Sequence, residues 1–464
     1  MTAVKKATRD FTEGPLFFRI LTFSLPLMAT ALLSIFYNTA DNIVVGRFSG
    51  DPLALAAVGS TTGLTSLITN FLFGFAAGGG VIIAQLFGAK DEEGVSKASH
   101  TIMTFSAIGG IVFMLIGLAV SKPALMLMGT KPELLDKAVL YLRIICLGIP
   151  FSSLYNFGAS IIRSTGDSKT PLIILSCSGL VNLVLNMIFV IVFNMSVAGV
   201  ALATVISQLI SAVCIVTILL RKKNECFGIK LNKLGIDKKI FPTFFRYGLP
   251  SGINSSFFAL TAVFMSSAVN TFPTAAVTAR AISSNIDQLC HSTIASFASA
   301  AVTVVGQNFG AKKPERIKKS IFCLAVQTVV LGIIIGTVLL LFADKLALLF
   351  IEPGSADPDA IISFTMEILS ITLSMSFING TWQMLSGSVR GMGYSFTAMM
   401  ISLIGAAIFR ILWILFIFPL EPMNTITGLF MLFPFSWSLT GIMLGIAVFV
   451  AYLRLKRSVT QPEN

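Results

Sequence analysis

The chain has 464 residues, of which 55% are hydrophobic and 12% are charged, and its formal net charge is +12. Soluble domains carry about 25% charged residues, so this composition excludes a soluble protein and predicts an all-α polytopic membrane protein. The basic excess fits cytoplasmic loops better than a nucleic-acid partner. Residues 1–11 contain Lys5, Lys6 and Arg9 but no small-residue cleavage site, so we expect a short cytoplasmic tail and not a signal peptide.

Twelve apolar segments are long enough to cross a bilayer, which takes about 20 helical residues. Basic residues follow every even-numbered segment, whereas the loops after the fifth and seventh carry no charge. The positive-inside rule then predicts a multi-pass plasma-membrane protein with both termini in the cytoplasm. The segments lie near 16–45, 53–80, 98–120, 134–160, 170–194, 197–220, 244–271, 275–303, 318–342, 361–387, 395–418 and 431–453.

Two short motifs each occur twice, at a nearly constant spacing. Residues 84–90, AQLFGAK, match 306–312, GQNFGAK, and residues 163–166, RSTG, match 390–393, RGMG. In the first pair of motifs, Gly88 and Gly310 are expected to be left-handed caps just past helix ends. Gln85 and Gln307 are expected to cap or bridge helix ends at the cytoplasmic face. The repeat indicates two halves with the same orientation in the membrane.

The repeat defines the predicted domains: an N-terminal six-helix lobe, 1–221, a basic cytoplasmic linker, 222–243, and a C-terminal six-helix lobe, 244–464. Duplicated halves are typical of alternating-access transporters, whose substrate site lies between the repeats. A duplicated channel or a membrane enzyme is the alternative. We favour transport without enzymatic activity.

The first apolar segment contains one carboxylate, Asp41, which is costly inside a membrane and therefore indicates a functional site. The fifth segment carries Asn182 and Asn186 one turn apart, and the sixth carries Thr204. A carboxylate, two amides and a hydroxyl are the oxygen ligands that a small cation or a water-linked proton site uses. For the two asparagines, hydrogen bonds that only join helices are an equal alternative.

The second half contains Asp287 in the eighth segment, with Arg280 about two turns earlier on the same helix face. We expect these two side chains to form an ion pair. Arg410 in the eleventh segment also needs a partner, which the sequence does not identify. The six cysteines form no CxxC pair and the two histidines lie far apart, so no metal site or resident cofactor is expected.

Over nearly its whole length the chain resembles the multidrug and toxic compound extrusion (MATE) family. The resemblance rests on the two glutamine-containing motifs, on RSTGDSKTP at 163–171, on GVALAT at 199–204 and on PFSW at 434–437. It implies two six-helix lobes, related by pseudo-twofold symmetry, that form a V around a central cavity. It also implies ion-coupled export of small amphipathic, often cationic, compounds, and we expect a monomer.

The resemblance also bears on the coupling ion. In several members the N-lobe positions matching Asp41, Asn182, Asn186 and Thr204 form the cation or proton site, and an aspartate typically occupies the position of Asn186. One carboxylate in place of two favours H+ over Na+ as the transported ion. The acid that one branch of the family carries in its seventh helix is missing here, which weakens the case for that branch's sodium site.

The lining of the substrate cavity is the least defined part of the prediction. Promiscuous pockets use flexible Met and aromatic surfaces. Candidate lining residues on plausible helices are Phe36, Tyr37, Asn38, Tyr155, Met265, Asp287 and Trp382. For each aromatic residue and for Met265, ordinary packing is the alternative. A lipid-linked oligosaccharide or peptidoglycan-precursor flippase of the same superfamily is the rival function, but it would be expected to line its cavity with several basic residues.

Overall fold

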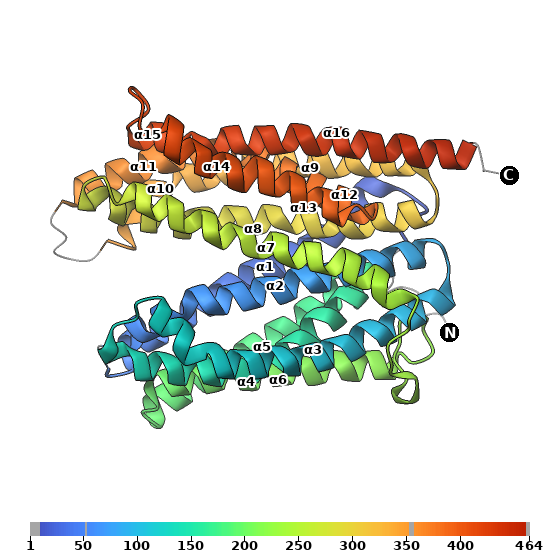
Figure 1. Cartoon of the computed structure of the whole chain (residues 1–464), viewed down its shortest axis with the longest axis horizontal. Coiled ribbons are helices and arrows are strands. Elements are labelled where there is room, and N and C mark those ends of the chain that lie inside the picture. The colour runs from blue at the N-terminus through green and yellow to red at the C-terminus, as the bar shows by residue number, and fades with distance from the viewer. Residues whose placement is uncertain (1–9, 52, 352–356, 461–464) are drawn as a thin grey trace. The chain divides into compact units, whose positions relative to one another are not determined.

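The computed structural model describes residues 10–51, 53–351 and 357–460. All regular secondary structure within these residues is helical (Figure 1). The helices of the first half are α1 (Leu16–Phe48), α2 (Ala54–Gly88), α3 (Glu92–Leu127), α4 (Pro132–Ser164), α5 (Lys169–Met187) and α6 (Ser196–Arg221). Those of the second half are α7 (Ile240–Val269), α8 (Thr274–Gly310), α9 (Pro314–Leu341), α10 (Ala343–Leu348), α11 (Pro358–Ser374), α12 (Ser376–Gly391), α13 (Ser395–Ser402), α14 (Phe409–Leu412), α15 (Ile426–Phe430) and α16 (Leu432–Thr460).

Local sequence signals explain where several helices begin. Pro132, Pro314 and Pro358 each open a helix, at a position where the missing backbone N–H costs nothing. The Asp91 side chain accepts a hydrogen bond from the Gly94 N–H at the start of α3. Such a side-chain cap satisfies one of the free donors of the first turn.

Long apolar helices coincide with the predicted membrane segments. Among the described residues, 10 helical spans are long and apolar enough to cross a membrane, and α11 with α12, bent by 46°, would make 11. α7 covers most of the predicted seventh segment. The eleventh segment is irregular, because π-helical stretches at Leu403–Ile408 and Trp413–Ile417 flank the short helix α14. The predicted all-helical membrane architecture is therefore present.

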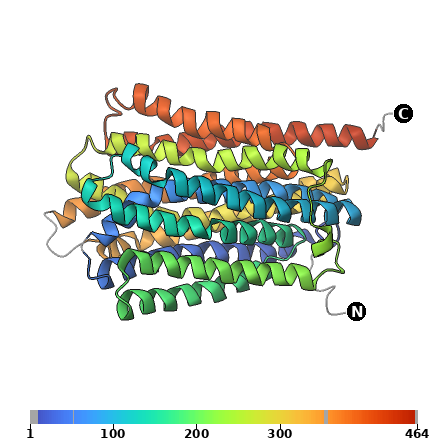
Figure 2. The ribbon, with the colours of Figure 1, turned by 60° about the horizontal axis from the view of Figure 1, so that its bottom comes forward.

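The described chain packs into two compact units whose limits fall inside helices. Unit 1 contains residues 29–255, and unit 2 contains residues 11–28 and 256–464. The first part of α1 thus packs with the second half of the chain, and the first part of α7 packs with the first half. Within unit 1, α5 and α6 lie beside each other, as the turned view shows (Figure 2).

The core of unit 1 is built around phenylalanine rings. Phe75 of α2 contacts Phe244 of α7 and Phe105 of α3, with ring centroids 5.1 and 5.0 Å apart. Helix α2 approaches α7 closely at Gly78, where an added Cβ would lie 2.4 Å from the Cα of Gly248. Small residues at such contacts let membrane helices pack backbone to backbone.

Unit 2 includes the N-terminal segment that precedes α1. Phe11 is fully buried and contacts Phe23 edge to face. Its backbone N–H donates to the Gln307 side chain at 2.9 Å, and its carbonyl accepts hydrogen bonds from Asn308 and from the Arg316 guanidinium. The second copy of the glutamine motif therefore binds the backbone of the N-terminal segment.

The predicted left-handed glycine caps were wrong. The residues with positive φ in the two repeats are Lys90 (59°) and Lys312 (53°), each two positions beyond the expected glycine. At both sites the next N–H, that of Asp91 or Lys313, donates to a carbonyl in the last helical turn. The equivalent conformation of both motifs shows that the sequence repeat is also a structural repeat.

Candidate functional site

A cluster of polar side chains in unit 1 lies where α1, α5 and α6 meet. Asp41 projects from the second half of α1, and its carboxylate accepts a hydrogen bond from the Asn186 side-chain amide of α5. The Asn186 amide also donates to the Asn182 carbonyl at 3.3 Å. The Asn182 amide lies 3.5 Å from the Thr204 hydroxyl of α6. The structure therefore brings the four predicted ion-coupling residues together.

One polar atom of this cluster is left without a protein partner. Asn186 is fully buried, and its side-chain carbonyl oxygen has no hydrogen-bond partner among the described residues. A buried carbonyl without a partner is costly. A water molecule or a small cation beside Asp41 would satisfy it, so the cluster can hold a proton-linked water or an ion.

The other candidate residues of unit 1 have mixed positions. Phe36 and Asn38 are exposed on α1. Tyr37 donates its hydroxyl to the Ser176 carbonyl at 3.2 Å, and Tyr155 donates to the Pro171 carbonyl at 3.1 Å. These two tyrosines join α1 and α4 to α5, so each has a structural role in the observed state.

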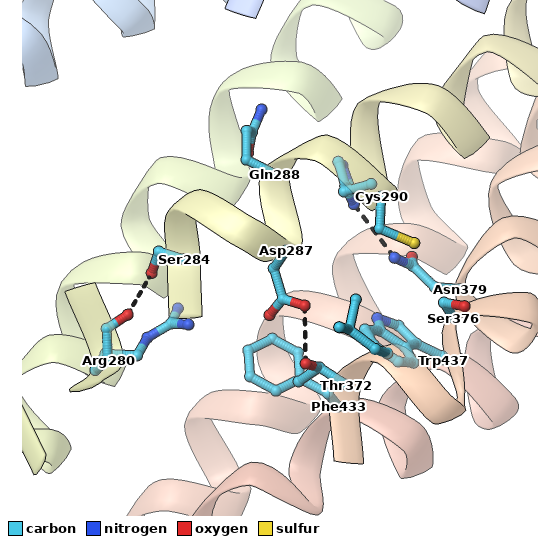
Figure 3. A pocket seen from close by; sticks show the side chains of 12 residues that line it. Arg280, Ser284, Asp287, Gln288, Cys290, Thr372, Ser376, Asn379, Phe433 and Trp437 are labelled. Atoms are coloured by element: carbon cyan, nitrogen blue, oxygen red, sulfur yellow. Dashed lines mark hydrogen bonds between the residues drawn. The ribbon is translucent and has the colours of Figure 1, made fainter. Parts of the chain in front are cut away.

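A second polar site lies within unit 2, in a cavity of about 270 Å³ between α8, α11, α12 and α16 (Figure 3). Asp287 of α8 lines it and accepts a hydrogen bond from the Thr372 hydroxyl at 2.8 Å. The expected ion pair of Asp287 with Arg280 was wrong. The Arg280 guanidinium instead stacks on the Phe430 ring, 5.3 Å from its centroid, and acts on Asp287 only through space.

Next to Asp287 is a network of uncharged polar groups. The Asn379 amide lies 3.3 Å from His291, and its carbonyl accepts hydrogen bonds from Trp382 and Gln383, each at 3.0 Å.

Arg410 also has partners: its Nε donates to the Ser436 hydroxyl at 2.9 Å and its guanidinium covers the Phe433 ring.

Two predicted cavity residues of unit 2 are parts of its apolar core. Met265 is 3% exposed and Trp382 is 5% exposed, in separate clusters of buried side chains. Neither lines the described cavity, whose aromatic residues are Phe433 and Trp437.

The sequence analysis did not single out Thr372, Ser376 or Asn379, all of which line this cavity. They follow one another at intervals of one helical turn, which places them on one helix face despite the bend between α11 and α12. That polar spacing within an apolar segment was a signal that could have indicated the site.

A duplicated helical bundle with a carboxylate and amides inside its membrane spans is the architecture of an alternating-access transporter. Comparison with known proteins identifies the class more closely. A family model described as MatE matches residues 26–188 and 250–416. The chain therefore belongs to the multidrug and toxic compound extrusion (MATE) family of efflux transporters, which are not enzymes.

Named relatives and solved structures resemble the chain along most of its length. The probable multidrug resistance protein YoeA of Bacillus subtilis is 27% identical over 377 residues, which are 80% of either chain. The multidrug export protein MepA of Staphylococcus saprophyticus is 24% identical and covers 92% of this chain with 91% of its own.

The solved structure of a multidrug resistance MATE family transporter in the outward-facing conformation has a TM-score of 0.89 at 22% identity, over 99% of both chains. A crystal structure of MATE in complex with MaL6 gives 0.88 at 21% identity. These likenesses confirm the predicted fold class, an all-helical membrane protein with the MATE fold.

Proposed function

We propose that this chain is an antiporter that exports amphipathic, often cationic, drugs and toxic compounds in exchange for protons, by alternating access. The observation that supports the proposal most directly is the hydrogen-bonded cluster of Asp41, Asn186, Asn182 and Thr204 in unit 1. A carboxylate inside a membrane span is costly while it is charged. Uptake and release of a proton by Asp41 would couple that cost to the transport cycle.

The composition of the cluster favours H+ over Na+. Only one carboxylate is present, since Asn186 contributes an amide that already donates to Asp41. Sodium would have to be held by one acid, the free Asn186 carbonyl and hydroxyl or water oxygens. A proton needs only the Asp41 carboxylate itself, and the Asn186 carbonyl can bind the water that delivers it.

The relatives carry names of multidrug resistance and multidrug export proteins, which supports small amphipathic substrates and the plasma membrane as the site of action. We further propose a monomer with both termini and the linker 222–243 in the cytoplasm. In this scheme protonation of Asp41 from outside accompanies drug release, and deprotonation inside permits drug rebinding.

The test is export by Asp41→Asn in proteoliposomes with an imposed proton gradient. The neutral amide mimics the protonated acid, so we expect an unchanged melting temperature and loss of pH-driven export to the background level. Asp136→Asn, which removes an exposed acid at the start of α4 in the same unit, is the matched control and should transport normally.

Two results would count against the mechanism. Export by Asp41→Asn at the wild-type rate under a proton gradient would remove Asp41 from the coupling step. A strict sodium requirement in the wild-type protein would replace the proton by sodium while leaving the export function intact.

A further inference from the structure

The cavity of unit 2 contains an arginine that the protein leaves available. Among the described residues, no hydrogen bond or ion pair engages the Arg280 guanidinium. It lies over the ring of Phe430, 5.3 Å from the ring centroid. That contact leaves the N–H groups at the edge of the guanidinium plane free to donate. Arg280 lines the cavity together with the polar side chains of Ser284, Gln288 and His291.

The charge around the cavity is positive on balance. Asp287 is the one carboxylate among its lining residues, and one of its oxygens accepts from Thr372. A second guanidinium, that of Arg410, does not line the cavity but covers the ring of Phe433, which does, and donates to the Ser436 hydroxyl. Two guanidinium groups against one carboxylate favour an anionic guest over a cationic one, because charges interact strongly where water is scarce.

The walls of the cavity suit a flat apolar group. Phe433 and Trp437 of α16 line it, and the Trp437 side chain is directed into the space beside Asp287 in the close view (Figure 3). Aromatic rings favour stacked or edge-to-face contact with other rings. A volume of about 270 Å³ is near the lower limit for small-molecule sites, so the guest should be small.

We propose that this cavity binds the carboxylate of a small aromatic acid, with Arg280 as the anion-binding residue and Phe433 and Trp437 against the ring. A guanidinium presents two parallel N–H donors that match the two oxygens of a carboxylate. That such acids are also transported rests on the proposed export function. Their binding in this cavity does not depend on transport.

Binding can be followed through Trp437, one of the chain's three tryptophans. In purified detergent-solubilised protein, 4-nitrobenzoate should quench tryptophan fluorescence at lower concentration than 4-nitrobenzamide, its uncharged analogue of similar shape. Trp437→Phe should remove most of the quenching. Equal quenching by both compounds would show that the carboxylate is not recognised and would overturn the proposal.

The role of Arg280 is tested by charge and by geometry. Arg280→Gln should weaken 4-nitrobenzoate binding about 10-fold to 100-fold, the loss expected for a charge-assisted hydrogen-bond pair. Arg280→Lys, which keeps the charge without the two parallel donors, should lie in between. Arg457→Gln, at the exposed end of α16, is the control and should bind normally. Unchanged binding in folded Arg280→Gln would overturn the assignment.

Asp287→Asn gives an independent result with the opposite sign. Removing the competing carboxylate should strengthen 4-nitrobenzoate binding, whereas a site built for cations would instead lose affinity for 4-nitrobenzylamine and leave the benzoate unaffected. The latter pattern would overturn the proposal. Because no ion gradient is present, these outcomes do not depend on proton-coupled export, and Asp41→Asn should bind the acid normally.

Discussion

Asp51 joins three elements at one end of unit 1. Its carboxylate accepts hydrogen bonds from the Lys137 ammonium of α4 at 2.6 and 2.8 Å. It also accepts from the Leu53 N–H at 3.1 Å and from the Ser196 hydroxyl at 3.3 Å. The loop between α1 and α2 is thereby tied to the second turn of α4 and to the first residue of α6.

This ion pair should make the stability of unit 1 depend on pH. Hydrogen bonding to Lys137 holds the pKa of Asp51 below its ordinary value. The stabilisation is therefore complete above about pH 4 and is lost as the pH falls through the lowered pKa. Asp51→Asn should lower the melting temperature at pH 7, by an amount equivalent to at most about 1 kcal/mol, and the gap to wild type should narrow as the pH falls below about 4.

Lys137→Gln is the reciprocal variant and should show the same pattern. A destabilisation of Asp51→Asn that is as large at pH 3 as at pH 7 would mean that its backbone and hydroxyl contacts matter, and not its charge.

Single residues differ in how far the sequence could predict their partners. The spacing of Asn182 and Asn186 alone places them on one helix face. Asp41, to which Asn186 donates, is the one acid in its predicted segment. Arg280 and Asp287 also share a face, yet Asp287 bonds to Thr372 on a different helix. Spacing gives neighbours within a helix, whereas the rotation and separation of packed helices decide which groups meet between helices.

At the level of the elements, the contact between α2 and the first part of α7 depends on glycine. Around Gly78, an added Cβ would also lie 2.6 Å from the Tyr247 carbonyl. Backbone atoms cannot move aside as a flexible side chain can, so this contact sets the separation of the two helices.

Gly78→Ala should therefore destabilise the protein by about 1–3 kcal/mol, the usual cost of overpacking. Gly59→Ala, on the same helix but with no atom within 4 Å of the added Cβ, is the matched control and should be neutral or slightly stabilising. Thermal unfolding of the two variants in the same detergent provides the comparison, and equal melting temperatures would show that the helices can separate at no cost.

The lengths of the elements also show what the sequence could reveal. The predicted second and eighth segments end at 80 and 303, but α2 and α8 continue to Gly88 and Gly310. Hydropathy detects the apolar part of a helix that bilayer hydrocarbon can cover. The added residues, VIIAQLFG at 81–88 and VVGQNFG at 304–310, are mostly apolar apart from the glutamine motifs, so these helices extend beyond the length that a bilayer crossing requires.

At the level of the whole molecule, the orientation in the membrane rests on the distribution of basic loops. An introduced thiol at Asn232→Cys, in a variant otherwise free of cysteine, should react with a membrane-impermeant reagent only after the cells are opened. Asn424→Cys lies in the exposed turn before α15 and follows an odd-numbered segment, so it should react in intact cells. Labelling of Asn232→Cys in intact cells would contradict both cytoplasmic termini.

The N-terminal segment has a consequence for the order in which the chain matures during synthesis. Phe11 is synthesised early, but its hydrogen-bond partners Gln307, Asn308 and Arg316 are synthesised about 300 residues later. Unit 1 likewise lacks residues 240–255 until translation has passed its own six helices. Each unit takes most of its helices from one half of the chain but also needs a segment from the other half. Neither unit can therefore finish folding until both halves have been synthesised.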